Sequence, residues 1–186
     1  MCLIVAVISL TGCSAVKNPE QMAASVKDVY TAAQNIETTV NITSHLGEQT
    51  MTYQIQYVYQ KQEDTSSAVM TVLAPQSIAG ITAEITGDDF CFSYADTQLE
   101  TAMPDRKGYT PVDVTTYLLY DLMHTVPQQV WMEGETLALR FEQELDEGTG
   151  IKEVYLNPQT GALTGARIYY NGKQSLQCVF ETCTLK

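Results

Sequence analysis

The residue with the most informative chemical setting is Cys13, whose thiol ends the run Leu10-Thr11-Gly12-Cys13. An apolar stretch, residues 2–10, precedes this run, and a polar stretch, residues 14–21, follows it. The apolar stretch is shorter than the about 20 residues that span a bilayer as a helix, so we interpret it as an export signal.

The four residues resemble the lipobox of bacterial lipoproteins in every position. The resemblance implies cleavage before Cys13, lipidation of its thiol, and anchoring at the outer face of the cytoplasmic membrane. We therefore expect residues 1–12 to be a signal peptide and residues 13–186 to form one domain. No Lys or Arg precedes Cys13, which is consistent with a truncated signal peptide. The alternative is an N-terminal strand or core helix that contains these letters by chance.

Three further cysteines, Cys91, Cys178 and Cys183, allow at most one disulfide among them in an exported protein. Strand alternation places Cys178 on the same face as Leu176 and Phe180, so we expect a buried free thiol. Cys91 and Cys183 alternate away from apolar neighbours, and a bridge between them is the alternative. No CxxC or CxxH spacing points to zinc, and we predict no metal site.

The composition excludes several classes of partner. The net charge is −12, with 22 acidic and 10 basic residues, and 45% of the residues are hydrophobic. A protein of this charge lacks the basic surface that nucleic acids or anionic lipid headgroups require. Membrane affinity must then come from the lipid on Cys13, and the apolar content is sufficient for one globular domain.

The remaining polar side chains form no coherent catalytic constellation. His45 and His124 are the only histidines, and they lie in a predicted turn and near a predicted helix end. No nucleophile elbow, phosphate-binding loop or dinucleotide loop is present. The acidic run at 142–147 lacks the order of a calcium loop and is typical of a solvated strand end. We therefore predict a non-enzymatic protein without a cofactor.

Hydrophobic periodicity predicts two helices, with five or six strands between them and about five strands after the second. Asn18-Pro19-Glu20 is a helix start, and the apolar period of a helix continues to about Ile36. A second helix is predicted from about Thr110 to the residues before Pro127, with an apolar face that includes Leu118 and Leu122. Period-two alternation predicts strands at 39–46, 52–60, 68–73, 81–86, 90–94, 99–102, 130–132, 136–143, 151–156, 166–170 and 176–184.

Short connections between these strands favour antiparallel pairing. Open sheets of more than about 10 strands tend to curl. We therefore predict an α+β fold with a strongly curved antiparallel sheet, a half-barrel, whose concave face is covered by the two helices. An aromatic face on two of the strands suggests a cavity for an apolar ligand, and an ordinary filled core is the alternative. The candidate cavity residues are Tyr53, Ile55, Tyr57, Tyr59, Phe90, Phe92, Tyr94, Leu118 and Leu122.

Two local patterns resemble a known superfamily. One is Val72-Leu73-Ala74-Pro75 followed by Gly80-Ile81-Thr82 and the aromatic strand at 90–94; the other is Val154-Tyr155-Leu156-Asn157-Pro158 with Gly161-Ala162-Leu163. The chain resembles the LolA/LolB superfamily of lipoprotein-localisation factors, which also includes the periplasmic domain of RseB. The resemblance implies an N-terminal helix, a curved half-barrel and helices at its mouth.

The resemblance also implies a function. We expect an anchored, non-catalytic protein that binds a lipid, an acyl chain, or a lipidated or apolar peptide in the cavity. The alternative is an RseB-like module that contacts or senses an envelope protein and holds no small ligand. LolA has an arginine inside its cavity, but Arg140 alternates away from Leu139 and Phe141 and should face solvent. A tethered protein can receive or sense cargo, whereas shuttling requires a soluble one.

Overall fold

The computed structural model describes residues 18–46, 49–62, 65–86, 89–95, 97–102 and 107–186. Cys13 and the predicted signal peptide 1–12 lie outside the described residues. The helices are α1 (Pro19–Ala32) and α2 (Val114–His124). The strands are β1 (Asn35–Leu46), β2 (Gln49–Gln62), β3 (Thr65–Ala74), β4 (Thr82–Thr86), β5 (Asp89–Tyr94), β6 (Thr97–Ala102), β7 (Gln129–Glu133), β8 (Thr136–Leu145), β9 (Gly148–Leu156), β10 (Leu163–Tyr170) and β11 (Lys173–Leu185).

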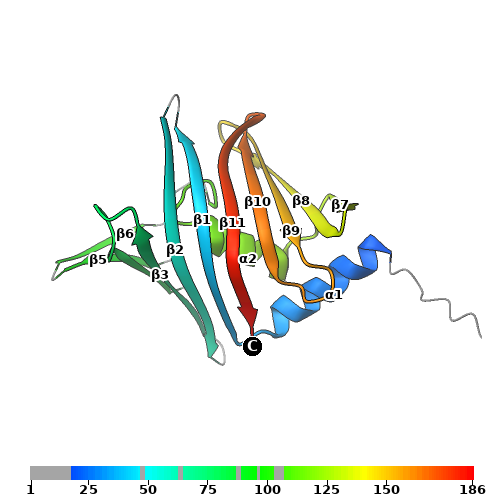
Figure 1. The fold of residues 1–186 in the computed structure, drawn as a ribbon, viewed down its shortest axis with the longest axis horizontal. Coiled ribbons are helices and arrows are strands. Elements are labelled where there is room, and N and C mark those ends of the chain that lie inside the picture. The colour runs from blue at the N-terminus through cyan, green and yellow to red at the C-terminus, as the bar shows by residue number, and fades with distance from the viewer. Residues whose placement is uncertain (1–17, 47–48, 63–64, 87–88, 96, 103–106) are drawn as a thin grey trace, which may run out of the picture.

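All eleven strands belong to one antiparallel sheet with the order β6-β5-β4-β3-β2-β1-β11-β10-β9-β8-β7 (Figure 1). The first six strands therefore follow one another from β1 outwards, and the last five run back to meet β1. The two groups join where β1 pairs with β11, for example at Ile42 and Cys178. The prediction of an α+β fold with antiparallel pairing is confirmed, and the structure has six strands before α2 and five after it.

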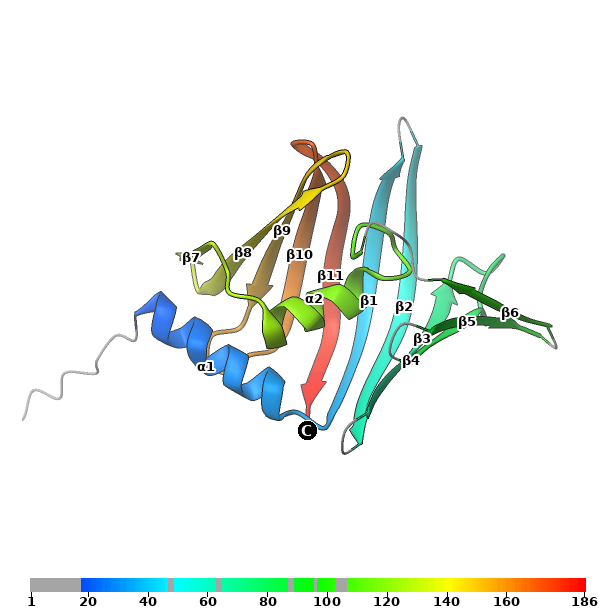
Figure 2. The same cartoon turned by 180° about the vertical axis from the view of Figure 1, so that it is seen from behind.

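The expectation of a strongly curved half-barrel is wrong, because the sheet is not strongly curled (Figure 1). Its centre consists of the long strands β1, β2 and β11, with 12, 14 and 13 residues. Figure 2 shows that both helices lie over one half of one face, while β4, β5 and β6 extend beyond them. The edge strands have no helix to wrap around, so strand number alone did not impose the curl.

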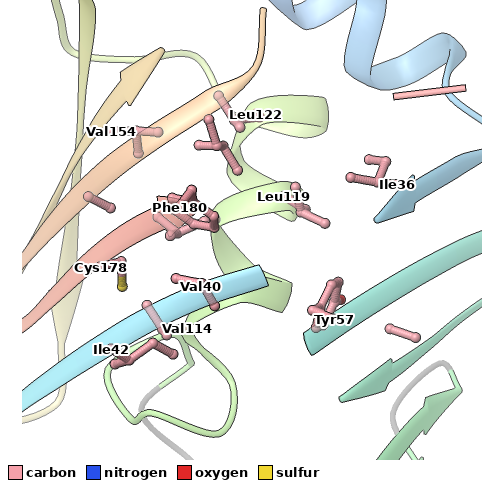
Figure 3. Packing of buried hydrophobic residues seen from close by; sticks show 14 of the residues in the cluster. Ile36, Val40, Ile42, Tyr57, Val114, Leu119, Leu122, Val154, Cys178 and Phe180 are labelled. Carbon is pink, nitrogen blue, oxygen red and sulfur yellow. The ribbon is translucent and has the colours of Figure 1, made fainter. Parts of the chain in front are cut away.

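Between the helices and the sheet lies a single apolar core. Alternate residues of the central strands point into it, as in β1, where Ile36, Val40 and Ile42 are fully buried. Figure 3 shows Leu119 and Leu122 of α2 among side chains from the central strands. The opposite face of the sheet is polar, as expected for an antiparallel sheet with one solvated face. Among the described residues, neither helix is long and apolar enough to cross a membrane.

Helix α1 ends four residues before the predicted end at Ile36. Asn18 caps it, because its side chain accepts a hydrogen bond from the Glu20 amide at 2.9 Å. The backbone of Asn35 instead bonds with Lys186 at the C-terminal end of the chain, and Ile36 enters β1. Sheet pairing therefore overrides the helical period. On α1, Tyr30 is buried, whereas Val29 is 43% exposed.

The cysteines are all free thiols in the described part of the chain. Cys178 is buried, as predicted, and burial raises the pKa of its thiol to about 12. The alternative bridge between Cys91 and Cys183 is not formed, because β5 and β11 are five positions apart in the sheet. With about 4.8 Å between neighbouring strands, that separation is several times the reach of a disulfide.

Candidate ligand-binding cavity

A cavity of about 410 Å³ follows helix α2, and we call it the α2 cavity. Side chains from β2, β3 and β4 form its apolar wall together with α2. They are Tyr57, Tyr59, Ala68, Ile85, Leu119 and Met123. Its lining also includes polar and charged side chains, among them Asp121, Gln143 and Lys152. One cavity thus offers both apolar surface and hydrogen-bonding groups, which is typical of small-molecule sites.

Two of the predicted cavity residues, Tyr57 and Tyr59, line the α2 cavity. Tyr57 is buried and its hydroxyl lies 3.1 Å from Thr116 Oγ1 on α2, so the hydrogen bond ties this helix to β2. Burial raises the pKa of Tyr57, and the hydroxyl stays protonated.

The structure does not gather the other predicted residues into the same cavity. Ile55, Phe90 and Leu118 are buried in the core. Tyr53 and Phe92 are partly buried against it, whereas Tyr94 is 54% exposed. Leu122 belongs to the core and reaches a separate cleft beside α1. The assignment of these residues to a ligand stays a prediction.

A buried ion pair lies at the polar side of the α2 cavity. Lys152 points inward from β9 and is 3% exposed, and its Nζ donates to Asp121 Oδ2 on α2 at 2.8 Å. The other oxygen of Asp121 accepts a hydrogen bond from the Thr125 hydroxyl at 2.9 Å. Charges are buried in proteins only when they are paired, and this pair fixes α2 against β9.

Aromatic rings surround the Lys152 ammonium. Its Nζ lies 5.3 Å from the ring centroid of Tyr109 and 5.7 Å from that of Tyr117. Cations are attracted to the faces of such rings within about 6 Å. The ammonium therefore has one carboxylate partner and an aromatic enclosure.

Tyr109 contributes a buried hydroxyl that has no hydrogen-bond partner among the described residues. The side chain is only 8% exposed. It lies directly over Gly150 of β9, where a Cβ atom would collide with the hydroxyl at 1.9 Å. Glycine at 150 is therefore required for this close approach. Burial and the nearby Asp121 carboxylate raise the pKa of Tyr109, so the hydroxyl remains a donor.

The loop that carries Tyr109 is held on both sides by one carboxylate. Asp113, which is fully buried, accepts hydrogen bonds from the Gly108 amide at 2.8 Å and from the Thr110 amide at 3.0 Å. The Thr110 hydroxyl donates to the same carboxylate at 2.6 Å. Burial raises the pKa of Asp113, against the effect of these hydrogen bonds. The arrangement fixes the backbone immediately before and after Tyr109.

A second cavity of about 220 Å³ adjoins the first, and we call it the Tyr109 cavity. It is lined by Tyr109 and also by Phe141 of β8. The two cavities have Asp121, Gln143 and Lys152 in common, so the ion pair lies where they meet.

Lys152 and Asp121 were not among the predicted cavity residues, although each has a detectable signal in the sequence. Lys152 has the parity of Val154 and Leu156, so alternation places it on the buried face of β9. Asp121 follows Leu118 by three residues and Val114 by seven, which is the apolar side of α2. In both cases a charged residue occupies a position that the periodicity of its strand or helix assigns to the buried face. Tyr109 lies in a loop, where no periodicity identifies a buried side chain.

An apolar cleft of about 290 Å³ adjoins the Tyr109 cavity, with which it shares Thr125 and Phe141, and we call it the α1 cleft. Its walls come from α1, from the segment after α2, and from β7 and β8. They include Ala23, Val126, Val130, Leu139 and Phe141. Val126 is 73% exposed, the largest exposed fraction among the large hydrophobic side chains described.

The other candidates from the sequence have structural surroundings of their own. Arg140 lies on the outer face of the sheet, as predicted, and pairs with Glu142 at 2.8 Å and with Glu153 at 3.7 Å. His124 ends α2 and packs against the Tyr120 ring, with the centroids 4.8 Å apart. His45 is exposed and lies within β1 rather than in a turn.

Comparison with known proteins identifies similar folds among solved structures but no similar sequence. No protein-family model matches the sequence, and no curated protein is significantly similar to it. Among solved structures, a chain of the Pseudomonas aeruginosa MucA/MucB complex is 12% identical with a TM-score of 0.52; the match covers 91% of this chain and 57% of that one. LprF from Mycobacterium bovis is 10% identical with a TM-score of 0.50, and the match covers 89% of this chain and 93% of LprF. The LolA superfamily protein NE2245 from Nitrosomonas europaea is 9% identical with a TM-score of 0.49, and the match covers 91% of this chain and 94% of NE2245. Identity this low shows the fold alone, and at that level the matches to the MucA/MucB chain and to LprF confirm the predicted resemblance.

Proposed function

We propose that this chain is a lipid-anchored, non-catalytic binding protein of the bacterial cell envelope, which holds an apolar ligand in the α2 cavity. The observation that carries the proposal is a cavity of about 410 Å³ between a helix and the inner face of the sheet, with an apolar wall that includes Tyr57, Ile85 and Leu119. Its volume lies within the range of about 300–1,000 Å³ that small-molecule sites occupy. The ligand classes are a lipid, an acyl chain, or a lipidated or apolar peptide.

The position of the cavity supports an apolar ligand over an ordinary core. The core beneath α2 is filled, since Leu118 and Val114 are fully buried. The α2 cavity lies beside this packing, and partly exposed Tyr59 contributes to its wall. A ligand could therefore enter without displacing the side chains that hold the helix to the sheet.

Binding is tested with the purified full chain and a fluorescent fatty acid, together with native mass spectrometry after gentle purification. We expect saturable uptake of the probe and a co-purifying lipid. Ala68→Phe would fill the space beside the apolar wall and should weaken uptake at least about tenfold, since about 1.4 kcal/mol or more of binding free energy is lost. Val69→Phe is the matched control, because Val69 is the next residue of β3 and is 41% exposed. Absence of both lipid and probe uptake would exclude a lipid carrier.

Anchoring is the second part of the proposal, with residues 1–12 as signal peptide and Cys13 as the lipidated residue. The sequence Leu10-Thr11-Gly12-Cys13 supports it, and the predicted location is the outer face of the cytoplasmic membrane. Cys13→Ala should move the protein from the membrane fraction to the soluble fraction. Cys91→Ala is the control, since this thiol lies within the folded domain. Continued membrane association of Cys13→Ala would contradict lipid anchoring.

A second candidate function is an interaction module for an envelope protein, without a small ligand. The α1 cleft favours it, because it exposes Val126 beside an apolar wall. A protein with this fold has been solved in the MucA/MucB complex. Photo-crosslinking from position 126 in cells should then give one defined adduct, and Val130→Lys should abolish it. A chain that binds the fluorescent fatty acid and forms no such adduct would favour the first function.

A further inference from the structure

We infer that the α2 cavity and the Tyr109 cavity form one site for an amphiphile, in which Lys152 and Tyr109 bind the carbonyl oxygen of an acyl ester or amide. The inference rests on the proposed function, because it assumes that an apolar chain occupies the α2 cavity. It adds the chemical class of the ligand's polar end and the residues that recognise it.

The first observation is the unpaired hydroxyl of Tyr109. Buried polar groups are nearly always hydrogen-bonded, and leaving one unpaired costs free energy. The Tyr109 hydroxyl is nevertheless held in one position. Asp113 accepts hydrogen bonds from the Gly108 and Thr110 amides on either side of Tyr109, and Gly150 has no side chain that would collide with the hydroxyl. A donor held this firmly beside a cavity, without a protein acceptor among the described residues, is a group that a ligand can satisfy.

The second observation is the ammonium of Lys152, which carries three N–H donors. Asp121 accepts one of them, and the structure gives the ammonium no other hydrogen-bond acceptor within the described ranges. The rest of its surroundings include the rings of Tyr109 and Tyr117. Lys152 lines both cavities, so its remaining donors are available to a group at their junction.

The charge at this junction selects a neutral acceptor. Lys152 and Asp121 together carry no net charge, and their charged atoms are 2.8 Å apart. A carboxylate or phosphate would meet the Asp121 oxygens in a medium of low dielectric constant, and a cation would meet the Lys152 ammonium. The oxygen of an ester or amide carbonyl accepts two hydrogen bonds and brings no charge. It therefore suits one donor from Lys152 and one from Tyr109.

The apolar wall defines the other end of the ligand. Tyr57, Ala68, Ile85 and Met123 line the α2 cavity away from β8 and β9, which supply Gln143 and Lys152. An alkyl chain would cover this wall while the carbonyl reaches the ion pair. The ligand class is thus a monoacyl ester or amide rather than a hydrocarbon or a detergent-like anion.

The test compares two probes that differ in one carbonyl group, 1-dodecanoylglycerol and 1-O-dodecylglycerol, with laurate as the charged analogue. Affinities are measured by displacement of the fluorescent fatty acid from the full chain. We expect the ester to bind about tenfold more tightly than the ether, which corresponds to one or two hydrogen bonds. Laurate should bind more weakly than the ester.

Tyr109→Phe removes the hydroxyl alone and should abolish most of the difference between ester and ether while leaving the affinity for the ether unchanged. The double variant Lys152→Met/Asp121→Asn removes the ammonium without leaving a buried charge and should have the same effect. Tyr30→Phe is the control, because its hydroxyl is buried outside both cavities and is already hydrogen-bonded to Gly161.

The outcomes separate the two proposals. Equal binding of ester and ether to the unmodified chain would overturn the carbonyl site and leave the apolar ligand intact. Tighter binding of laurate than of the ester would overturn the choice of a neutral acceptor. If none of the three probes binds, either by displacement of the fluorescent fatty acid or by native mass spectrometry, the proposed function fails with the inference. Loss of selectivity in Tyr30→Phe would show that a structural change suffices to explain the effect.

Discussion

Tyr30 on α1 and Tyr109 before α2 are both buried under the helical layer, but only one of the two hydroxyls has a partner. The Tyr30 hydroxyl donates to the Gly161 carbonyl at 3.0 Å and thereby closes the end of the β9–β10 connection against α1. The Tyr109 hydroxyl has no partner within the described residues and lines a cavity. The first region satisfies its polar groups internally, as a structural core does, and the second leaves donors unused. This difference is what the ligand site proposed around Tyr109 would require.

The largest effect on stability should come from breaking the ion pair of the cavity region. Lys152→Met leaves the Asp121 carboxylate buried without its cation and should lower the free energy of unfolding by about 3 kcal/mol. Lys152→Met/Asp121→Asn should recover most of this loss. The measurement is urea denaturation, followed by the fluorescence of Trp131, the only tryptophan. If Lys152→Met alone is as stable as the unmodified chain, water reaches Asp121 and the ion pair is not buried.

Asp113→Asn should lower the free energy of unfolding by about 2 kcal/mol at neutral pH, because an amide cannot accept all of the hydrogen bonds from Gly108 and Thr110. Burial raises the pKa of the native Asp113 carboxyl, so the folded state binds its proton more readily than the unfolded state. The contribution of Asp113 to stability therefore rises as the pH falls through the raised pKa toward about 4. The stability gap between the two proteins should widen over this interval, and a narrowing gap would contradict a raised pKa.

Tyr30→Phe probes the region without a ligand site. It removes a satisfied hydrogen bond and leaves the Gly161 carbonyl unpaired, so the free energy of unfolding should fall by about 1 kcal/mol. The same denaturation experiment measures the loss, and affinity for any amphiphile should stay constant. An unchanged stability would mean that water replaces the tyrosine at Gly161.

The smallest effect on stability, and the one of opposite sign, is expected for Tyr109→Phe. The hydroxyl has no hydrogen-bond partner within the part of the chain that the structure describes, so its removal should leave the free energy of unfolding unchanged or raise it by up to about 1 kcal/mol. A substitution that stabilises the protein while weakening ester binding is the signature of a functional group rather than a structural one. A loss as large as that of Tyr30→Phe would remove the contrast between the two regions.

Much of this architecture was predictable from local patterns. Alternation identified all eleven strands, and it assigned Cys178 to the core and Arg140 to the outer face. The end of α1 was not predictable in this way, because Ile36 continues the helical period and only pairing with β11 and β2 draws it into a strand. The prediction of a strongly curled sheet failed for a similar reason. The curl of the sheet depends on where the helices lie and not on the number of strands alone.

Some residues of the cavity were likewise predictable from local patterns, and others were not. Tyr57 and Tyr59 were predicted from the aromatic face of one strand, and they line the α2 cavity. Lys152 and Asp121 were overlooked because each interrupts an apolar pattern, and a single charge in such a pattern does not reveal its partner on another element. Tyr109 has no pattern at all, and its burial follows from the hydrogen bonds of Asp113 and from the missing side chain at Gly150.

The sequence by itself determined the strands, their buried faces, the acidic surface and the lipobox-like run at Cys13, because each depends on neighbours within a few residues. The tertiary structure decided the open shape of the sheet, the pairing of Lys152 with Asp121, and the isolation of the Tyr109 hydroxyl. These features depend on segments that are far apart in the chain, and their energies arise only when burial removes water from the groups involved.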